Sequence, residues 1–320
     1  MSKLHNRIIQ GDCIEVLNKI DEPIADLIFA DPPFNIGYKY DKYYDRVKSK
    51  NYIAWTQIWM QACKKVLKPY GSFYIAIGDD YAANVKLIAD EIGLTIRNWI
   101  IWHYTFGQQT KNKFARSHTH VFYFVNDKDN FTFNDHAVRV PSDRQLLYND
   151  KRADPQGKMP DDVWNQYSRV CGTFKERVQW HPCQMPESLL RRIILASSNT
   201  GDCVLDPFNG SGTTAAAAIQ LDRNYIGIEM SKQYVENSRK RLQELESLTA
   251  DQKRNIMLTQ LLIDMKLSSA EILVDKKLLT LFANQLKIRT NSDQPDDIAI
   301  IEKYLKDLAT AGAKIWPNRS

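Results

Sequence analysis

The chain has 320 residues, a length that suits one large α/β domain with an added module, or two domains. Its hydrophobic content of 43% and charged content of 25% are those of a globular protein, and its net charge of +5 permits a nucleic-acid partner without requiring one. Five cysteines without a C-x-x-C pair argue against a disulfide scaffold or a zinc site, and no apolar run approaches the ~18 residues of a membrane span. We therefore expect a cytoplasmic protein with no metal and no membrane partner.

The first thirty residues predict a strand, a short helix and a second strand. Residues 6–10 are interpreted as a short strand, and the apolar run 25–30 is typical of a buried parallel strand. Residues 14–20 are spaced as an amphipathic helix, which Asp12 is placed to cap. On this pattern alone we prefer a capping role for Asp12.

The second strand ends abruptly at Asp31-Pro32-Pro33-Phe34, the strongest candidate site in this half of the chain. Ligands of open α/β sheets bind at the carboxyl ends of strands. Two prolines remove two N–H donors, so a carboxylate lies beside a bare carbonyl, and this pair of acceptors suits an exocyclic amine. Phe34 adds a flat face for a planar base. A simple turn with an N-cap aspartate is the alternative interpretation.

Residues 35–50 form a loop rich in glycine, tyrosine and lysine that leaves directly from this motif. Interleaved basic and aromatic residues fit a polyanion with stacking faces, although a solvated polar loop is nearly as good an interpretation. The candidate contacts to such a polyanion in this loop are Tyr38, Lys39, Lys42, Arg46 and Lys48.

Residues 52–125 predict core elements and no site. These are a helix at 52–67, a strand at 72–77, a helix at 81–92, and an edge hairpin of strands 94–102 and 121–125 separated by residues 106–119. Trp55 and Trp59 have helical spacing with aliphatic residues, which favours core packing. His118 and His120 alternate along a strand with no third ligand at matching spacing, so we interpret them as strand-edge histidines.

From residue 126 to residue 177 the apolar periodicity weakens and basic residues scatter. Irregular basic segments inserted between core strands often carry recognition, and loops of this length without a role are uncommon. The candidate recognition residues in this region are Arg139, Arg144, Lys151 and Arg152.

The second strong signal is a strand ending at Asp206, a turn of small residues at 209–213 and an alanine-rich helix. Such a turn lets backbone N–H groups and a helix amino terminus approach an anion. A stiff, proline-bracketed turn at 180–186 precedes it. The helix at 187–197 comes between them, with its arginines expected to face outward.

A strand at 225–228 follows and ends in Glu229, about 20 residues beyond the glycines, as expected of a carboxylate that binds ribose hydroxyls. Because Thr214 stands where a dinucleotide site has its third glycine, an amino-acid carboxylate suits the turn better than a pyrophosphate. An amino-acid carboxylate together with a ribose describes S-adenosylmethionine. Residues 231–248 close this unit as a charged helix.

The remainder of the chain, residues 249–320, is expected to be a separate helical module. Three helices are predicted, at 252–265, 276–289 and 297–308. The sequence indicates no chemistry in this module.

Taken together, these motifs resemble those of the β-type DNA amino-methyltransferases, which act on adenine N6 or cytosine N4. The shared motifs are D-P-P-F, then H-P-x-Q-x-P just before D-P-F-x-G-S-G-T, and their order places target recognition between a catalytic and a cofactor half. The resemblance implies an α/β fold, a Rossmann-like S-adenosylmethionine-dependent methyltransferase sheet with an inserted recognition region and a C-terminal helical module. The expected divisions are 1–125, 126–177, 178–248 and 249–320.

By this resemblance, Asp31 and the Pro32 carbonyl would accept hydrogen bonds from the target amine, next to Pro33, and Phe34 would stack on the flipped base. Asp12 and the Cys13 backbone would bind the cofactor's adenine, which overturns the preference for a cap alone, and Glu229 would bind its ribose. The rest of the cofactor would be held by Asp31, His181, Gln184, Pro186, Asp206, Phe208, Asn209, Gly210, Ser211, Gly212 and Thr213.

The implied reaction moves the methyl group of S-adenosylmethionine to the N6 amine of a flipped adenine in double-stranded DNA, in a bacterial restriction-modification or epigenetic system. A cognate restriction endonuclease and a homodimer are the further partners to consider. Aspartate at position 31 favours adenine over the cytosine N4 alternative. A dinucleotide oxidoreductase is disfavoured by the G-S-G-T-T turn, and a non-enzymatic DNA-binding protein by intact Asp31, Gly210 and Glu229.

Overall fold

The structure is a computed structural model that describes residues 4–38, 41, 45–108, 110–148, 150–172, 174, 176–290 and 298–310. The chain divides into two compact units: unit 1 comprises residues 1–133 and 162–247, and unit 2 comprises residues 134–161 and 248–320. These divisions differ from the expected ones. Of the expected recognition region 126–177, only residues 134–161 lie outside unit 1. That middle part belongs to the same unit as the C-terminal helices, which we expected to be separate.

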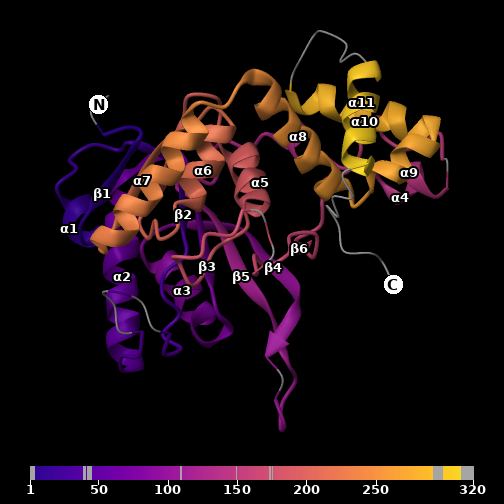
Figure 1. The fold of residues 1–320 in the computed structure, drawn as a ribbon. Helices are drawn as coiled ribbons and strands as arrows, with labels where there is room; N and C mark the ends of the chain where they lie inside the picture. Colours follow the sequence, from indigo (N-terminus) through magenta and orange to yellow (C-terminus); the bar gives the residue numbers. More distant parts are fainter. Residues whose placement is uncertain are drawn as a thin grey trace. The chain divides into compact units, whose positions relative to one another are not determined.

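Unit 1 is built on one sheet, and the order of its described strands is β1-β8-β7-β2-β3-β5-β4-β6 (Figure 1). The first five strands in this order are parallel, and β5 runs antiparallel to both of its neighbours. The strand bounds are β1 Arg7–Gln10, β2 Ala25–Ala30, β3 Leu67–Ile77, β4 Thr95–Gln108, β5 Arg116–Val125, β6 Val163–Trp164, β7 Cys203–Asp206 and β8 Asn224–Glu229.

Two groups of helices pack on this sheet: α2 contacts both α1 and α3, and α6 contacts both α5 and α7 (Figure 1). The connection β2–α2–β3 moves one way along the sheet and β7–α6–β8 moves the other way, so right-handed crossovers place α2 and α6 on opposite faces. The reversal between β7 and β2 is a topological switch point, where α/β sheets bind ligands. The helix bounds are α1 Cys13–Asn18, α2 Ser49–Val66, α3 Asp79–Glu91, α5 Glu187–Ser197, α6 Thr213–Gln220 and α7 Lys232–Glu246.

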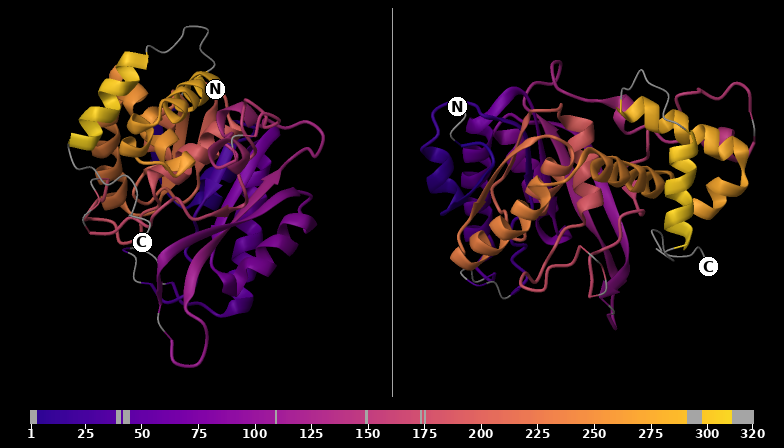
Figure 2. Two further views of the ribbon diagram at one scale, coloured as in Figure 1. Left: turned by 90° about the vertical axis from the view of Figure 1, so that its right-hand side faces the viewer. Right: turned by 45° about the horizontal axis from the view of Figure 1, so that its top comes forward.

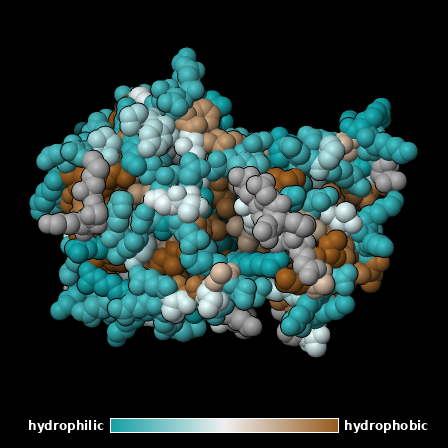
Figure 3. Space-filling view, turned by 90° about the horizontal axis from the view of Figure 1, so that it is seen from above, coloured by the Kyte–Doolittle hydropathy of each residue, from teal (hydrophilic) through white to brown (hydrophobic). Residues whose placement is uncertain are grey.

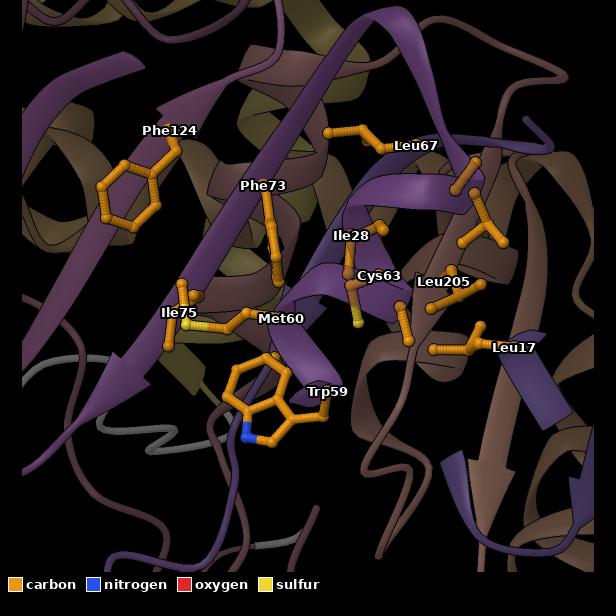
Figure 4. Close-up of a cluster of buried hydrophobic side chains, with 14 of the residues drawn as sticks. Leu17, Ile28, Trp59, Met60, Cys63, Leu67, Phe73, Ile75, Phe124 and Leu205 are labelled. Atoms are coloured by element: carbon orange, nitrogen blue, oxygen red, sulfur yellow. The ribbon is translucent and has the colours of Figure 1, made fainter. Parts of the chain in front are cut away.

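The core of unit 1 lies between α2 and the sheet (Figure 4). Trp59 and Met60 of α2 are fully buried beside Phe73 and Ile75 of β3. Full burial of side chains of this size contributes about 1.5–3 kcal/mol each. The expected core position of Trp59 is therefore confirmed.

The structure corrects the expectation that the arginines of α5 face outward, because Arg191 and Arg192 are both buried. Arg191 donates to Gln220 at 2.7 Å and pairs with Glu187 at 3.2 Å. Arg192 donates to the hydroxyl of Tyr167 at 2.8 Å and lies over its ring. Buried cations need such partners, and apolar periodicity does not reveal that partners from other elements are present.

The expected edge hairpin is present but is longer, and it does not form the edge of the sheet. Its strands run to Gln108 and start again at Arg116, so both ends of the expected separator 106–119 belong to the strands. β5 pairs with β3 on one side, and the short β6 pairs with β4 on the other. We name β4, β5 and their connection the long hairpin.

Unit 2 has a hydrophobic core of its own, which includes Leu258, Leu262, Phe282 and Ile301. The inserted segment 134–161 is tied to the C-terminal helices by hydrogen bonds. Its described elements are η1 Asp135–Ala137, α4 Asp143–Leu146, α8 Ala250–Met265, α9 Ser269–Val274, α10 Lys276–Thr290 and α11 Ile298–Thr310. The three helices expected in the C-terminal part are present, and the short α9 was not expected.

No helix in the described part of the chain is long and apolar enough to cross a membrane. On the face drawn in Figure 3, the coloured hydrophobic residues occur as small separate groups among hydrophilic ones.

Candidate functional site

A cavity of about 290 Å³ lies in unit 1, where the carboxyl ends of β1, β8, β7 and β2 meet. Each strand delivers residues to its wall as the chain leaves the sheet: Gly11 and Asp12 after β1, Asp31 after β2, Asp206 at the end of β7 and Glu229 at the end of β8. The sequence predicts one site after β2, at Asp31, and another after β7, at the glycine turn. The fold brings both to one cavity.

Most of the predicted cofactor residues line this cavity: Asp12, Cys13, Asp31, His181, Asp206, Phe208, Asn209, Gly210, Ser211, Thr213 and Glu229. Gln184, Pro186 and Gly212 are described but do not line it. Gln184 instead holds the proline turn together, because its amide oxygen accepts from the N–H of Val178 at 2.9 Å and its amide nitrogen donates to the carbonyl of Glu176 at 2.7 Å.

The turn at 209–213 requires glycine at two positions. Gly210 and Gly212 have φ of +46° and +75°, in the left-handed region where a side chain is strained. A Cβ at Gly210 would also lie 2.8 Å from Nε2 of His181. The backbone of this turn therefore passes directly against the proline turn at the cavity wall.

Glu229 is bound to the same turn through both of its oxygens. Oε2 accepts from the N–H of Gly210 at 2.9 Å, and Oε1 accepts from the N–H of Ser231 at 2.8 Å. Burial raises the pKa of Glu229, although these backbone N–H groups oppose the shift. A carboxylate has about four acceptor positions, so the side chain keeps capacity for a ligand.

Asp12 combines the two roles that the sequence left in competition. Its Oδ1 accepts from the N–H groups of Ile14 at 2.9 Å and Glu15 at 3.2 Å, which caps α1. Among the described residues, no hydrogen bond engages Oδ2, and the residue lines the cavity. A capping role and a binding role are therefore compatible.

Asp206 lies close enough to Asp31 for its charge to affect the ionisation of the Asp31 carboxyl. Burial raises the pKa of Asp31 to about 7, and the charge of Asp206 contributes to this shift. Burial also raises the pKa of Asp206 to about 7, although hydrogen bonds from Thr214 at 2.5 Å and Phe208 at 2.9 Å oppose the shift. Two desolvated carboxyl groups in one wall favour a ligand that carries positive charge.

The motif after β2 leaves one carbonyl available. The hydroxyl of Tyr52 donates to the carbonyl of Pro33 at 2.6 Å, whereas the Pro32 carbonyl accepts no hydrogen bond from any described residue. Phe34 packs on Gly78, where an added Cβ would lie 3.3 Å from the ring, and it does not line the cavity. The Asp31 carboxyl and the Pro32 carbonyl remain the acceptors at this position.

The loop that follows is folded around one buried carboxylate. Asp45 accepts from the N–H groups of Asn35 at 2.6 Å, Ile36 at 3.2 Å and Tyr38 at 3.1 Å. The side chain of Asn35 bonds both the N–H and the carbonyl of Val47. The start of the loop is therefore fixed relative to the motif.

Arg241 of α7 holds the glycine turn from behind. Its guanidinium donates to the carbonyl of Ser211 at 2.7 Å and to the hydroxyl of Thr213 at 3.3 Å, and it pairs with Glu187 at 2.6 Å. Burial opposes ionisation of Glu187, yet Arg191 and Arg241 keep its pKa below the ordinary value. Sequence reasoning did not identify this arginine.

Several other residues of the cavity wall were not predicted. Trp55 was assigned to the core, but it lines the cavity, with its ring centre 5.8 Å from that of Phe208. Asp41 lines it as well and accepts a hydrogen bond from Ser231 at 2.7 Å. The remaining unpredicted lining residues are Gly11, Phe29, Cys183, Met185, Pro207, Thr214, Ile228, Met230, Ser231 and Tyr234.

The predicted DNA contacts are distributed over both units. In the loop after the motif, Tyr38, Arg46 and Lys48 are exposed, while Lys39 and Lys42 lie outside the described residues. In unit 2, Arg144, Lys151 and Arg152 are exposed. Arg139 instead makes contacts inside unit 2, where it pairs with Asp135 at 2.8 Å and donates to the carbonyl of Gly157 at 3.0 Å.

The cavity fits a ligand with the chemistry of S-adenosylmethionine. Gly11 and Gly210 line the cavity without side chains of their own. The carboxyl groups of Asp31, Asp206 and Glu229 line it as well, and the pKa of each is raised. Such carboxyl groups favour a ligand that carries positive charge. Within the described residues, no group of three or more His, Cys, Asp and Glu is arranged to hold a metal ion.

A largely parallel sheet with a glycine turn and a buried carboxylate at its switch point is the arrangement of a Rossmann-like methyltransferase fold. The family model for DNA methylases matches residues 25–240, and the chain belongs to this family. The predicted DNA amino-methyltransferase family is thereby confirmed.

Individual relatives support the same family assignment. The chain is 37% identical over 240 residues to the type II methyltransferase M.HpaI of Haemophilus parainfluenzae, with 75% of this chain and 74% of the relative covered. It is 38% identical over 253 residues to the DNA adenine methyltransferase YhdJ of Escherichia coli K12, with 77% and 85% covered. In fold it is similar to the DNA modification methylase TTHA0409 of Thermus thermophilus, solved with S-adenosyl-L-methionine, at 20% identity and a TM-score of 0.55 over 76% of this chain and 95% of that one.

Proposed function

We propose that this DNA methylase moves the methyl group of S-adenosylmethionine to the N6 amine of adenine at a specific site in double-stranded DNA. The observation that supports it best is that Asp31 lines the same cavity as the glycine turn, next in the chain to a Pro32 carbonyl that accepts no hydrogen bond from a described residue. The Asp31 carboxylate and the Pro32 carbonyl match the two N–H bonds of an exocyclic amine. The related YhdJ is named an adenine methyltransferase, in agreement with aspartate at position 31.

The residues would act on the amine by orientation and charge. An aromatic amine is a poor nucleophile because its lone pair is delocalised into the ring. Two acceptors on its hydrogens favour a pyramidal nitrogen, and the ionised Asp31 stabilises positive charge that develops there. S-adenosylmethionine supplies the methyl group as a reactive sulfonium.

The cofactor contacts are proposed from the same cavity. Glu229 would bind ribose hydroxyls and Asp12 the adenine, while the turn at 209–213 would hold the methionine part. The target base must leave the duplex to reach Asp31, at a cost of a few kcal/mol. A cognate endonuclease, a homodimer and a cytoplasmic location remain predictions.

The test is single-turnover transfer of labelled methyl groups to duplex DNA by Asp31→Ala and Asp31→Asn variants. Loss of the carboxylate should slow transfer at least ~10²-fold, because the interaction matters mainly in the transition state. Asp31→Asn, which keeps one acceptor oxygen, should be intermediate. Binding of DNA and of S-adenosylmethionine should persist within a few-fold in both.

Analysis of the modified nucleosides identifies the base. N6-methyladenine is the expected product, and N4-methylcytosine would refute the adenine assignment. Near-normal rates in Asp31→Ala would remove Asp31 from the catalytic site.

A further inference from the structure

The long hairpin extends past the edge of the sheet that carries the site. His120 pairs with Ile77, the last residue of β3, and also with Ile101, yet β4 continues to Gln108. At 3.3 Å per residue, this carries the hairpin roughly 20 Å beyond the end of β3. β4 is parallel to β3, because both are antiparallel to β5, so the extension points the same way as the strand end that delivers Asp31. Figure 1 and the left view of Figure 2 show it projecting from the sheet.

The charge on this hairpin has one sign. No aspartate or glutamate occurs between Glu91 and Asp127, and the cations of the hairpin are Arg97, Lys111, Lys113 and Arg116. Arg116 is used locally, because it pairs with Asp79 at 3.0 Å and with Asp80 at 3.3 Å at the start of α3. It anchors the hairpin to unit 1, whereas Lys111 and Lys113 are exposed near the tip.

The tip also carries an apolar side chain in solvent. The side chain of Phe114 is 98% exposed. By comparison, the exposed side chain of Leu87 on α3 is 60% exposed, so part of its surface is covered. The turn beneath it is held by a hydrogen bond from the hydroxyl of Thr110 to the carbonyl of Lys113. A ring on a two-stranded ribbon, flanked by lysines, has the composition of an element that enters a nucleic-acid groove.

We propose that the long hairpin is a duplex-DNA contact of this enzyme, in which Lys111 and Lys113 bind phosphates and Phe114 enters between base steps. The inference rests on the proposed function, which makes duplex DNA the substrate. It goes beyond that function by assigning a DNA-contacting element that supplies no group to the cofactor cavity. Because the hairpin extends beyond the carboxyl ends of the parallel strands, the proposed contact lies at the same edge of the sheet as Asp31, where the base must enter.

The experiment compares the full-length protein with Phe114→Ala and with Lys111→Gln/Lys113→Gln. Affinity for a duplex containing the preferred site is measured by fluorescence anisotropy over a range of salt concentrations, together with KM for DNA in methyl transfer. Phe114→Ala should weaken DNA binding about tenfold, the size of one lost stacking contact. The double lysine variant should lower the salt slope by about two, one for each phosphate contact.

Leu87→Ala is the matched control, since it removes an exposed hydrophobic side chain of unit 1 that lies away from the tip, and it should leave DNA affinity unchanged. Affinity for S-adenosylmethionine should be unchanged in every variant. Unaltered DNA affinity in Phe114→Ala together with an unaltered salt slope in the lysine variant overturns the proposal. A change in self-association by sedimentation, with DNA binding unaffected, overturns it in favour of a contact between copies. If the unmodified protein transfers no methyl group to DNA, the proposed function itself fails.

Discussion

Asp31 and Asp206 show how two residues of different motifs become one unit of chemistry. Each carboxyl is desolvated in the cavity wall, and the pKa of each is raised to about 7. Because the charge of Asp206 contributes to the raised pKa of Asp31, ionisation of Asp206 disfavours ionisation of Asp31. Only an ionised Asp31 can stabilise positive charge that develops on the amine, so a positive ligand beside these two carboxyl groups would prepare Asp31 for its role.

We therefore expect binding of S-adenosylmethionine to release protons near neutral pH. The raised pKa values mean that the free protein holds protons on this pair below about pH 7, and a cationic ligand favours their loss. Affinity should rise as the pH increases from about 6 to about 8, and proton release should fade above that range. Calorimetry in buffers of different ionisation enthalpy measures the release directly.

Two aspartates at opposite ends of β7, Asp206 and the preceding Asp202, separate this effect from general electrostatics. Asp206→Asn should reduce the proton release, since it removes one member of the pair. Asp202→Asn is the control, because that carboxyl lies at the opposite end of the same strand and its pKa is also raised by burial. Proton release that is absent from the unmodified protein would refute the assigned ionisation.

At the scale of elements, the strands and their motifs could be predicted from the sequence, but the neighbours of those motifs could not. Helices that follow parallel strands begin at the site edge and run back along the sheet. Trp55 lies one turn before Trp59 on the same helix, so the earlier tryptophan reaches the cavity while the later one is buried in the core. Periodicity shows which face of a helix is buried, but not whether the core or a ligand covers it.

The same limit applies to Arg241, which acts through a turn almost thirty residues earlier in the chain. Arg241→Met should weaken cofactor binding about tenfold, because it releases the carbonyl of Ser211 and the hydroxyl of Thr213 from their anchor. It should also destabilise unit 1, since Glu187 loses one of its two cations inside the protein. Calorimetric titration and thermal unfolding measure the two effects.

Lys240→Met is the matched control on the same helix, because Lys240 is exposed. Arg241→Lys should recover part of the affinity, since one ammonium can still reach one of the three acceptors. If Arg241→Met binds the cofactor normally, the arginine is not a positioning residue for the turn.

For the whole molecule, composition and motif order predict an α/β methyltransferase with an insertion and a helical tail, but not that the insertion and the tail form one unit. The contacts that join them are made by α10. Gln285 donates to the carbonyl of Gln156 at 2.9 Å, and Arg289 donates to the carbonyl of Arg139 at 3.2 Å. The side chain of Arg289 is fully buried and pairs with Asp264 at 2.5 Å. Such pairings between distant segments leave no periodic signal in either segment.

Removal of residues 249–320 should therefore separate two functions. Every residue that lines the cavity belongs to unit 1, so a folded truncated protein should bind S-adenosylmethionine within a few-fold of the full chain. Residues 134–161 should lose protection from hydrogen exchange, because their bonds to α10 and the core beside them are gone. Transfer to DNA should fall more than cofactor binding does, since Arg144, Lys151 and Arg152 are predicted DNA contacts in that segment. A truncated protein with native near-UV dichroism but no cofactor binding would show instead that the tail supports the cofactor site.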